Sequence, residues 1–244
     1  MRILILGGTG EARALADELA AGGVEVVSSL AGRVQRPRLP EGSVRIGGFG
    51  GASGLESYLR EERFDAVVDA THPFASTISA NASMAAARAG LPRLVLRRPG
   101  WELDPSWRTA ADMYATAATV RAWTGESVFL TTGRRDLAVF ASDDRHRFLV
   151  RTVDPPGGPV PPRMTLLLDR GPYTVDGELQ LMREHEIGLL VTKDSGGEMT
   201  AAKLHAARQL GLAVVVVLRP PVPAESAVIS TVSGAMEWLD AQLG

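Results

Sequence analysis

Arg2-Ile3-Leu4-Ile5-Leu6-Gly7-Gly8-Thr9-Gly10-Glu11-Ala12 joins an apolar run to a glycine-rich turn and the start of a helix. Such a run is typical of a parallel strand covered on both faces. The glycines let the backbone turn sharply and approach a ligand without a Cβ in the way. The helix expected over 10–21 would point its positive N-terminal end at the same place. This order predicts a phosphate-binding site for a nucleotide cofactor.

The dinucleotide fingerprint is met only in part, because Arg13 stands where that motif has Gly or Ala. A tight turn between strand and helix, without a ligand, is the alternative. The next expected strand supports the cofactor. It leads into Ser28-Ser29-Leu30-Ala31-Gly32-Arg33 and carries no carboxylate at its end, where NAD-binding folds place Asp or Glu. A hydroxyl and a guanidinium suit a 2′-phosphate, so Ser29 and Arg33 favour NADP over NAD.

Composition excludes several classes of function. The 244 residues contain no cysteine, which excludes disulfides, thiolate catalysis and Cys-ligated zinc. A formal charge of −2 gives no general attraction to nucleic acid or to an anionic membrane. The longest late apolar run, 212–218, is too short to cross a bilayer, and no targeting signal is evident. We therefore expect a cytoplasmic protein that binds neither nucleic acid nor membrane.

Strands and helices alternate along the chain, which predicts an α/β fold. We expect two Rossmann-like domains of about five strands each, with mainly parallel sheets and a ligand cleft between them. The Pro- and Gly-bearing stretch 98–105 marks the crossing, so the domains are 1–100, binding NADP, and 101–244, binding substrate. Expected strands are 2–6, 24–28, 43–46, 65–69, 93–97, 127–131, 147–151, 164–168, 188–192 and 213–218. Expected helices are 10–21, 53–62, 74–89, 109–123, 134–141, 174–186, 198–210 and 233–242.

Local signals refine these elements. Ser53 and Glu56 form a capping box at the start of the helix 53–62. Pro73 fits the first position of the helix after the fourth strand. The Pro-rich stretch 154–162 is expected to be an irregular, semi-rigid loop.

Polar residues follow three of the apolar strands, where open parallel sheets bind ligands. The first group is Thr71-His72-Pro73. In Thr131-Thr132-Gly133-Arg134-Arg135 the hydroxyls, glycine turn and guanidiniums at a helix start suggest an anion site. The third group, Lys193-Asp194-Ser195-Gly196-Gly197, carries one of only two lysines. We expect the other, Lys203, on the solvated face of a helix. The alternative for each group is an ordinary capped turn with surface charges.

Together these motifs resemble the precorrin-6A reductase family of cobalamin (vitamin B12) biosynthesis, in the same order and over nearly the whole chain. Arg135 stands where many members would have Lys. The resemblance implies an NADPH-dependent oxidoreductase that converts precorrin-6A to precorrin-6B, with hydride delivered to C19 and a proton to C18. Its substrate is a small tetrapyrrole-derived polycarboxylate, and no metal is required.

The resemblance also implies roles for particular residues. Backbone N–H groups of Gly8, Thr9, Gly10 and Glu11 would hold the pyrophosphate, and Ser29 with Arg33 the 2′-phosphate. Thr71, His72 and Pro73 would flank the nicotinamide. Substrate carboxylates would bind Thr132, Arg134, Arg135, Lys193 and Ser195. His72 and Lys193 are the candidate catalytic residues, although a bound water is an equal candidate for proton donor.

Two other functions are alternatives. Short-chain dehydrogenases use a Tyr with a Lys four residues on, but the three tyrosines here are followed at that spacing by Glu62, Ala118 and Gly177. An NADP-sensing regulatory module would not need a second domain with anion-binding loops. The oligomeric state and the choice between metal-free and cobalt-bearing substrate stay open.

Overall fold

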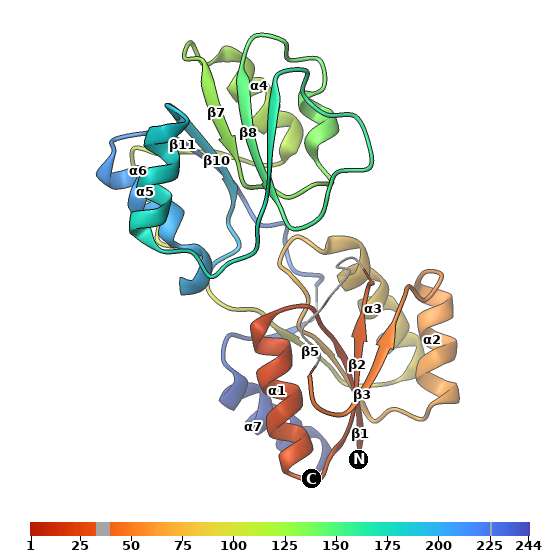
Figure 1. Cartoon of the computed structure of the whole chain (residues 1–244). Helices are drawn as coiled ribbons and strands as arrows, with labels where there is room; N and C mark the ends of the chain where they lie inside the picture. The colour runs from red at the N-terminus through yellow and green to blue at the C-terminus, as the bar shows by residue number, and fades with distance from the viewer. Residues whose placement is uncertain (33–39, 225) are drawn as a thin grey trace. The chain divides into compact units, whose positions relative to one another are not determined.

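The computed structural model describes residues 1–32, 40–224 and 226–244. The chain forms two compact units (Figure 1). The first consists of Met1–Pro99 and Pro220–Gly244, and the second of Gly100–Arg219. Each contains one sheet, with six strands among the described residues, and every strand pair in the two sheets is parallel. The expected pair of Rossmann-like α/β domains is confirmed.

The first unit has the strand order β3-β2-β1-β4-β5-β12, which is the dinucleotide-binding order 3-2-1-4-5-6. Its elements are β1 (Arg2–Leu6), α1 (Gly10–Ala21), β2 (Glu25–Leu30), β3 (Ser43–Ile46), α2 (Ala52–Glu61), β4 (Ala66–Asp69), α3 (Ser76–Ala89), β5 (Arg93–Leu96), β12 (Ala227–Ile229) and α7 (Val232–Leu243).

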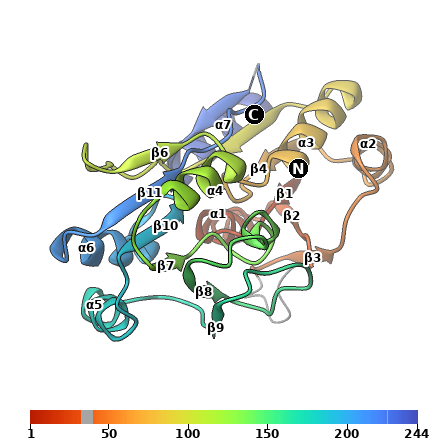
Figure 2. The same cartoon turned by 90° about the horizontal axis from the view of Figure 1, so that it is seen from above.

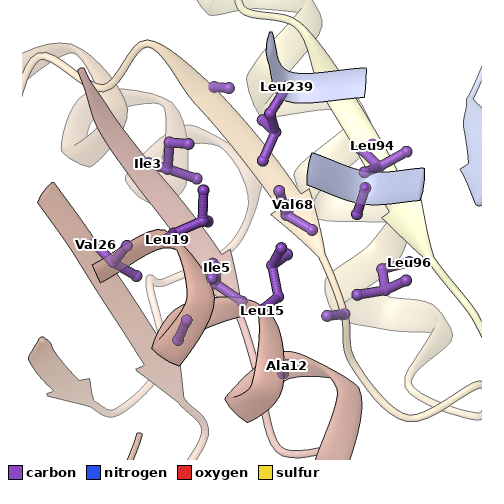
Figure 3. Close-up of a cluster of buried hydrophobic side chains, with 14 residues drawn as sticks. Ile3, Ile5, Ala12, Leu15, Leu19, Val26, Val68, Leu94, Leu96 and Leu239 are labelled. Carbon is purple, nitrogen blue, oxygen red and sulfur yellow. The ribbon is translucent and has the colours of Figure 1, made fainter. Parts of the chain in front are cut away.

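Both faces of this sheet are covered, as the apolar run of β1 predicts. Ile3 and Ile5 point to one face, where they pack with Leu15 of α1 and Leu239 of α7 (Figure 3). Leu4 and Leu6 point to the other face and pack under α2 and α3. Side chains alternate along a strand, so β1 contributes to both hydrophobic cores.

The second unit has the order β9-β8-β7-β10-β11-β6. Its elements are β6 (Arg108–Ala110), α4 (Met113–Ala122), β7 (Ser127–Leu130), the 3₁₀ helix η1 (Leu137–Phe140), β8 (Arg147–Thr152), β9 (Met164–Leu168), α5 (Val175–Glu184), β10 (Leu189–Lys193), the 3₁₀ helix η2 (Glu198–Thr200), α6 (Ala202–Gln209) and β11 (Ala213–Val217). Helices α5 and α6 lie side by side over one face (Figure 1 and Figure 2), while α4 and η1 cover the other.

The domain boundaries differ from those expected, 1–100 and 101–244. Residues 220–244 return to the first unit, where β12 pairs with β5 and α7 packs beside α1. Two three-residue edge strands, β6 and β12, were not expected. The helix expected over 109–123 begins only at Met113 because its first residues belong to β6.

Three local expectations are wrong. Helix α2 begins at Ala52 after Gly51, without a side-chain cap, so Ser53 and Glu56 do not form the capping box. Pro73 precedes α3 and occupies a turn closed by the Ala75 N–H and the His72 carbonyl, 2.7 Å apart. The expected helix 134–141 is reduced to the 3₁₀ helix η1. The loop 154–162 is irregular, as predicted.

Candidate functional site

The strand order of the first unit reverses at β1, which has β2 on one side and β4 on the other. Ligands of open α/β sheets bind beyond the carboxyl ends of the strands at such a reversal. The turn from β1 to α1 lies there, and Gly8 has φ +117°, a conformation that side chains disfavour. An added Cβ at Gly8 would have no atom within 4 Å, so the backbone here is open to a ligand.

Thr9 fixes this turn to its neighbours. Its Oγ1 accepts a hydrogen bond from the Ala12 N–H at 3.1 Å, which caps α1, and donates one to the Ala70 carbonyl at 2.9 Å. The Gly7 N–H donates to the Ser29 carbonyl at 2.9 Å. The structure therefore brings the turn at Gly8–Glu11 together with the ends of β2 and β4, where the other predicted cofactor residues lie.

Glu11 has a partner that the sequence did not suggest. Arg98, which follows β5, places Nη1 2.8 Å from Glu11 Oε2. Since Glu11 lies in the first turn of α1, this pair puts a guanidinium beside the positive end of the helix and compensates the carboxylate. The signal available from sequence was the Arg97-Arg98 pair directly after an apolar strand.

A cavity of about 310 Å³ opens beyond the ends of β4 and β5. Its lining includes all three predicted nicotinamide residues, Thr71, His72 and Pro73. Arg97 adds a guanidinium that donates to the Pro220 carbonyl from Nη1 and Nη2 at 3.1 and 3.2 Å. His72 Nδ1 accepts from the Phe74 N–H at 3.3 Å, so this ring nitrogen is already used within the loop.

The predicted 2′-phosphate residues lie at and beyond the end of β2. Ser29 is buried, one residue before the strand ends, and β2 ends without a carboxylate. Arg33 lies outside the described residues. The preference for a 2′-phosphate stays a prediction.

The second unit has the same reversal, at β7 and its neighbour β10. All the predicted substrate residues lie at the ends of these two strands or in the loops after them: Lys193 is the last residue of β10, and the others follow β7 or β10. Thr132 is 5% exposed, and its Oγ1 has no hydrogen-bond partner among the described residues. Gly133, with φ +84°, turns the chain directly after it.

Lys193 and Asp136 link the two loops. Lys193 Nζ lies 2.5 Å from Asp136 Oδ2, a contact across 57 residues of sequence. Lys193 is thus an ammonium with a carboxylate partner, suited to holding a proton beside the loops. Ser195 is turned back onto the same strand end, with its N–H 2.7 Å from the Lys193 carbonyl.

Arg134 and Arg135 are exposed and lie in a turn before η1. The helix dipole expected to support anion binding here is therefore missing, and the guanidiniums themselves carry the positive charge. Arg134 Nη1 donates to the Pro155 carbonyl at 3.1 Å, which ties this turn to the irregular loop after β8.

Asp194 anchors the loop after β10. Its Oδ1 accepts from the Trp101 N–H at 3.0 Å, and its Oδ2 lies 3.1 Å from Arg219 Nε. Trp101 Nε1 donates to the Gly197 carbonyl at 3.1 Å. Trp101, near the start of the second unit, and Arg219, at its end, thus hold the loop that follows Lys193 and contains Ser195.

Lys203 lies in the interior, contrary to the expected solvated face. It is 5% exposed, donates from Nζ to the Thr200 carbonyl at 2.5 Å, and places Nζ 4.6 Å from the Trp101 ring centroid. The pKa of Lys203 is lowered to about 7, mainly by burial and also by the charge of Arg151, while the charge of Glu178 acts in the opposite direction. Arg151 and Glu178 are themselves buried and paired at 2.6 Å.

Comparison with known proteins identifies the family. The model of the family described as "Precorrin-6x reductase CbiJ/CobK" matches residues 2–240. The chain belongs to this family. It is 55% identical to the precorrin-6A reductase of Rhodococcus erythropolis over 241 residues, covering 98% of this chain and 97% of the relative. It is also 55% identical to the precorrin-6A reductase of Mycobacterium tuberculosis over 240 residues, with the same coverage.

A solved structure supports the same assignment. "CobK precorrin-6A reductase" superposes with a TM-score of 0.90 at 42% identity, covering 100% of this chain and 98% of that one. As a member of the precorrin-6x reductase family, the chain is an oxidoreductase of cobalamin biosynthesis. Along the described residues, no helix is both long and apolar enough to cross a membrane. The same residues contain no cluster of three His, Cys, Asp or Glu side chains arranged for a metal ion.

Proposed function

We propose that this chain reduces precorrin-6A to precorrin-6B with NADPH, delivering hydride to C19 and a proton to C18 of the macrocycle. The observation that carries the proposal is the 55% identity to precorrin-6A reductases over 98% of the chain. In the balanced reaction, one NADPH and one proton are consumed, and NADP⁺ is released.

The first unit fits a dinucleotide. It has the strand order of that class, an open glycine turn at the reversal, and a cavity at the end of β4 and β5. The bound cofactor would supply the hydride, and the protein would supply binding and orientation. Backbone N–H groups of Gly8, Thr9, Gly10 and Glu11 would hold the pyrophosphate, with Arg98 as the neighbouring cation. Thr71, His72 and Pro73 would border the nicotinamide.

NADPH is favoured over NADH by the end of β2. An acidic residue there would bind ribose hydroxyls and repel a 2′-phosphate, but β2 ends in Ser29 and Leu30. Ser29 and Arg33 would bind the 2′-phosphate.

The second unit would hold the substrate. Arg134 and Arg135 are cations on the loop after β7, Lys193 is a cation at the end of β10, and Thr132 and Ser195 add hydroxyls. A macrocycle fringed with carboxylates is complementary to this set. Lys193, held by Asp136, is the candidate donor of the proton to C18.

An anaerobic assay with NADPH and precorrin-6A tests the reaction. Loss of nicotinamide absorbance should match conversion of the macrocycle one to one. If neither spectrum changes with precorrin-6A but both change with its cobalt-bearing form, the substrate assignment is wrong and the reductase assignment stands. If Lys193→Ala keeps normal turnover at saturating substrate, Lys193 has no role in the chemical step.

Two variants test the cofactor roles in the same protein. Arg33→Ala should weaken NADPH binding about tenfold or more and leave NADH binding unchanged, since only NADPH has the 2′-phosphate. Arg98→Met should weaken both cofactors by the same factor, because they share the pyrophosphate. Calorimetry measures the four dissociation constants, and equal affinity of the wild type for NADH and NADPH would contradict the preference.

A further inference from the structure

Asp69 is a buried carboxylate at the edge of the cavity in the first unit. It is the last residue of β4 and is 2% exposed. Its Oδ1 accepts hydrogen bonds from the Thr71 N–H at 3.2 Å and from the Thr71 hydroxyl at 2.7 Å. Its Oδ2 is enclosed, without a hydrogen-bond partner among the described residues. Thr71 is therefore the residue that provides this carboxylate with hydrogen bonds.

The guanidinium of Arg93 interacts electrostatically with Asp69 but does not take over the hydrogen bonding of Thr71. Arg93, on the neighbouring strand β5, feels the charge of Asp69, which opposes the lowering of the Arg93 pKa by burial. Its Nη2 donates to Ser83 at 3.2 Å and to Ser226. A buried charge that loses a hydrogen bond is costly, so Asp69 holds the Thr71 hydroxyl firmly.

This bond fixes what Thr71 can offer to a ligand. A carboxylate has no hydrogen to give, so the Thr71 hydroxyl must be the donor. Its single hydrogen is then used, and Oγ1 can only accept from other groups. Ser79 Oγ lies 3.5 Å from Thr71 Oγ1, on the first turns of α3.

The cavity around Thr71 combines this acceptor with apolar walls. Thr71, Asp69 and Ser79 line it together with Val95, Pro221 and Val222. A fitting ligand has a flat apolar surface and a hydrogen-bond donor at one end. In a dinucleotide that crosses the reversal at β1, the adenosine half lies toward β2 and the nicotinamide half toward β4 and β5. The carboxamide N–H₂ is the donor on the nicotinamide ring.

We propose that Asp69 makes Thr71 a pure hydrogen-bond acceptor, and that Thr71 selects the amino group of the nicotinamide carboxamide. Asp69 is a positioning residue and Thr71 is the contact. This inference rests on the proposed function, because it takes the nicotinamide cofactor as the ligand of the cavity.

The test compares NADPH with its reduced 3-acetylpyridine analogue, in which a methyl group replaces the amino group and the carbonyl is kept. Binding is measured by calorimetry without macrocycle, so that catalysis does not enter. The wild type should bind NADPH about tenfold more tightly, since the analogue leaves a buried acceptor unpaired. The reduced thionicotinamide analogue keeps the amino group and should bind like NADPH.

Variants of Thr71 and Asp69 test whether these two residues cause the preference for NADPH over the acetylpyridine analogue. Thr71→Val should lower the ratio of the two dissociation constants to about one by weakening NADPH alone, and Thr71→Ser should keep the ratio. Asp69→Ala should lower the ratio at least threefold, because no oxygen at this position then accepts the Thr71 hydrogen and the hydroxyl is free to donate to other groups. Thr119→Val, a matched change on α4 of the second unit, should leave it unchanged. Thermal unfolding confirms that each variant is folded.

Each of the other possible results contradicts one part of the proposal. A wild-type ratio near one overturns the selection, although NADPH binding itself then supports the proposed function. An unchanged ratio in Thr71→Val overturns the role of Thr71, and an unchanged ratio in Asp69→Ala overturns that of Asp69. Absence of NADPH binding by the wild type overturns the cofactor assignment and this inference with it.

Discussion

Lys203 is a buried lysine whose surroundings favour the neutral amine over the charged ammonium. Burial is the largest effect on its pKa, which falls to about 7, and the positive charge of Arg151 acts in the same direction. The charge of Glu178 and the hydrogen bond to the Thr200 carbonyl favour the ammonium, but they do not outweigh burial. Lys203 thus loses its proton in the folded protein at a pH where it keeps the proton in the unfolded chain, whose ordinary value is 10.5.

This difference predicts a pH dependence of stability. Between about pH 7 and 10.5 the unfolded chain binds one proton more than the folded chain at this site, so raising the pH favours the folded state. Lys203 should make the free energy of unfolding rise by at most about 1.4 kcal/mol for each pH unit in that window. Denaturant unfolding of the wild type and of Lys203→Met at several pH values measures it.

The difference between these two proteins isolates Lys203 from other titrating groups. Lys203→Met should be more stable than the wild type at pH 7, and its advantage should shrink as the pH rises toward 10. Arg121→Met, an exposed change on α4, should show a difference that does not vary with pH. A constant difference for Lys203→Met would show that the folded-state pKa is not lowered.

Among the elements, α2 has a close backbone contact at Gly54, in its first turn. A Cβ added at Gly54 would lie 1.8 Å from the Phe49 carbonyl oxygen, which is backbone and cannot rotate away. The loop that carries Phe49 is itself held, because Arg45 lies 3.9 Å over the Phe49 ring and donates to the Gly47 and Gly48 carbonyls at 2.8 Å. The backbone of the loop therefore lies directly against the first turn of α2 at Gly54, which has no side chain.

Gly54→Ala should destabilise the first unit although alanine is the better helix former. Alanine propensity contributes about 1 kcal/mol in favour of the variant. The clash forces the loop or the helix to move, which costs about 1–3 kcal/mol in packed structures and more when backbone is displaced. We expect a net loss, measured by thermal or denaturant unfolding. Ser53→Ala, one position earlier, should change little because Ser53 caps nothing; a stabilised Gly54→Ala would contradict the contact.

The sequence predicts elements well where the signal is local and repeated. Apolar runs such as 2–6 and 213–217 are strands because they are buried on both faces of a sheet. Prediction from sequence fails where a contact between residues far apart in the chain determines the structure. The capping pattern at Ser53 is not used, because α2 begins one residue earlier, at Ala52. Strands β6 and β12 are too short to show a period. Their pairing with β11 and β5 involves segments far apart in the chain.

At the scale of the whole molecule, the site residues that were predicted are defined by adjacent residues, and those that were missed are defined by contacts with distant ones. The turn at Gly8 is encoded by adjacent residues and was predicted. Arg98 and Asp136 were missed because their partners, Glu11 and Lys193, lie 87 and 57 residues away. Asp69 lies two positions before the predicted group Thr71-His72-Pro73, but only its bond to Thr71 and its burial reveal its role.

The return of residues 220–244 is the largest departure from the sequence-based organisation, and it makes the first unit discontinuous. Ala235 and Leu239 of α7 are fully buried in the core formed with Leu15 and Leu94 (Figure 3). A chain of residues 1–99 alone would leave this part of the sheet uncovered. It should bind a hydrophobic dye and melt without a sharp transition, because small domains have little stability to lose.

A chain in which 1–99 is joined to 220–244 by a short Gly/Ser linker should fold. The two ends are close, since the Arg97 guanidinium donates to the Pro220 carbonyl at 3.1 Å, and β12 would restore the edge of the sheet. This chain should melt cooperatively and, under the proposed function, bind NADPH because every predicted cofactor residue is present. Circular dichroism and calorimetry compare the two shortened chains with the full protein. Cooperative melting of 1–99 alone would show that α7 covers the core without being needed for the fold.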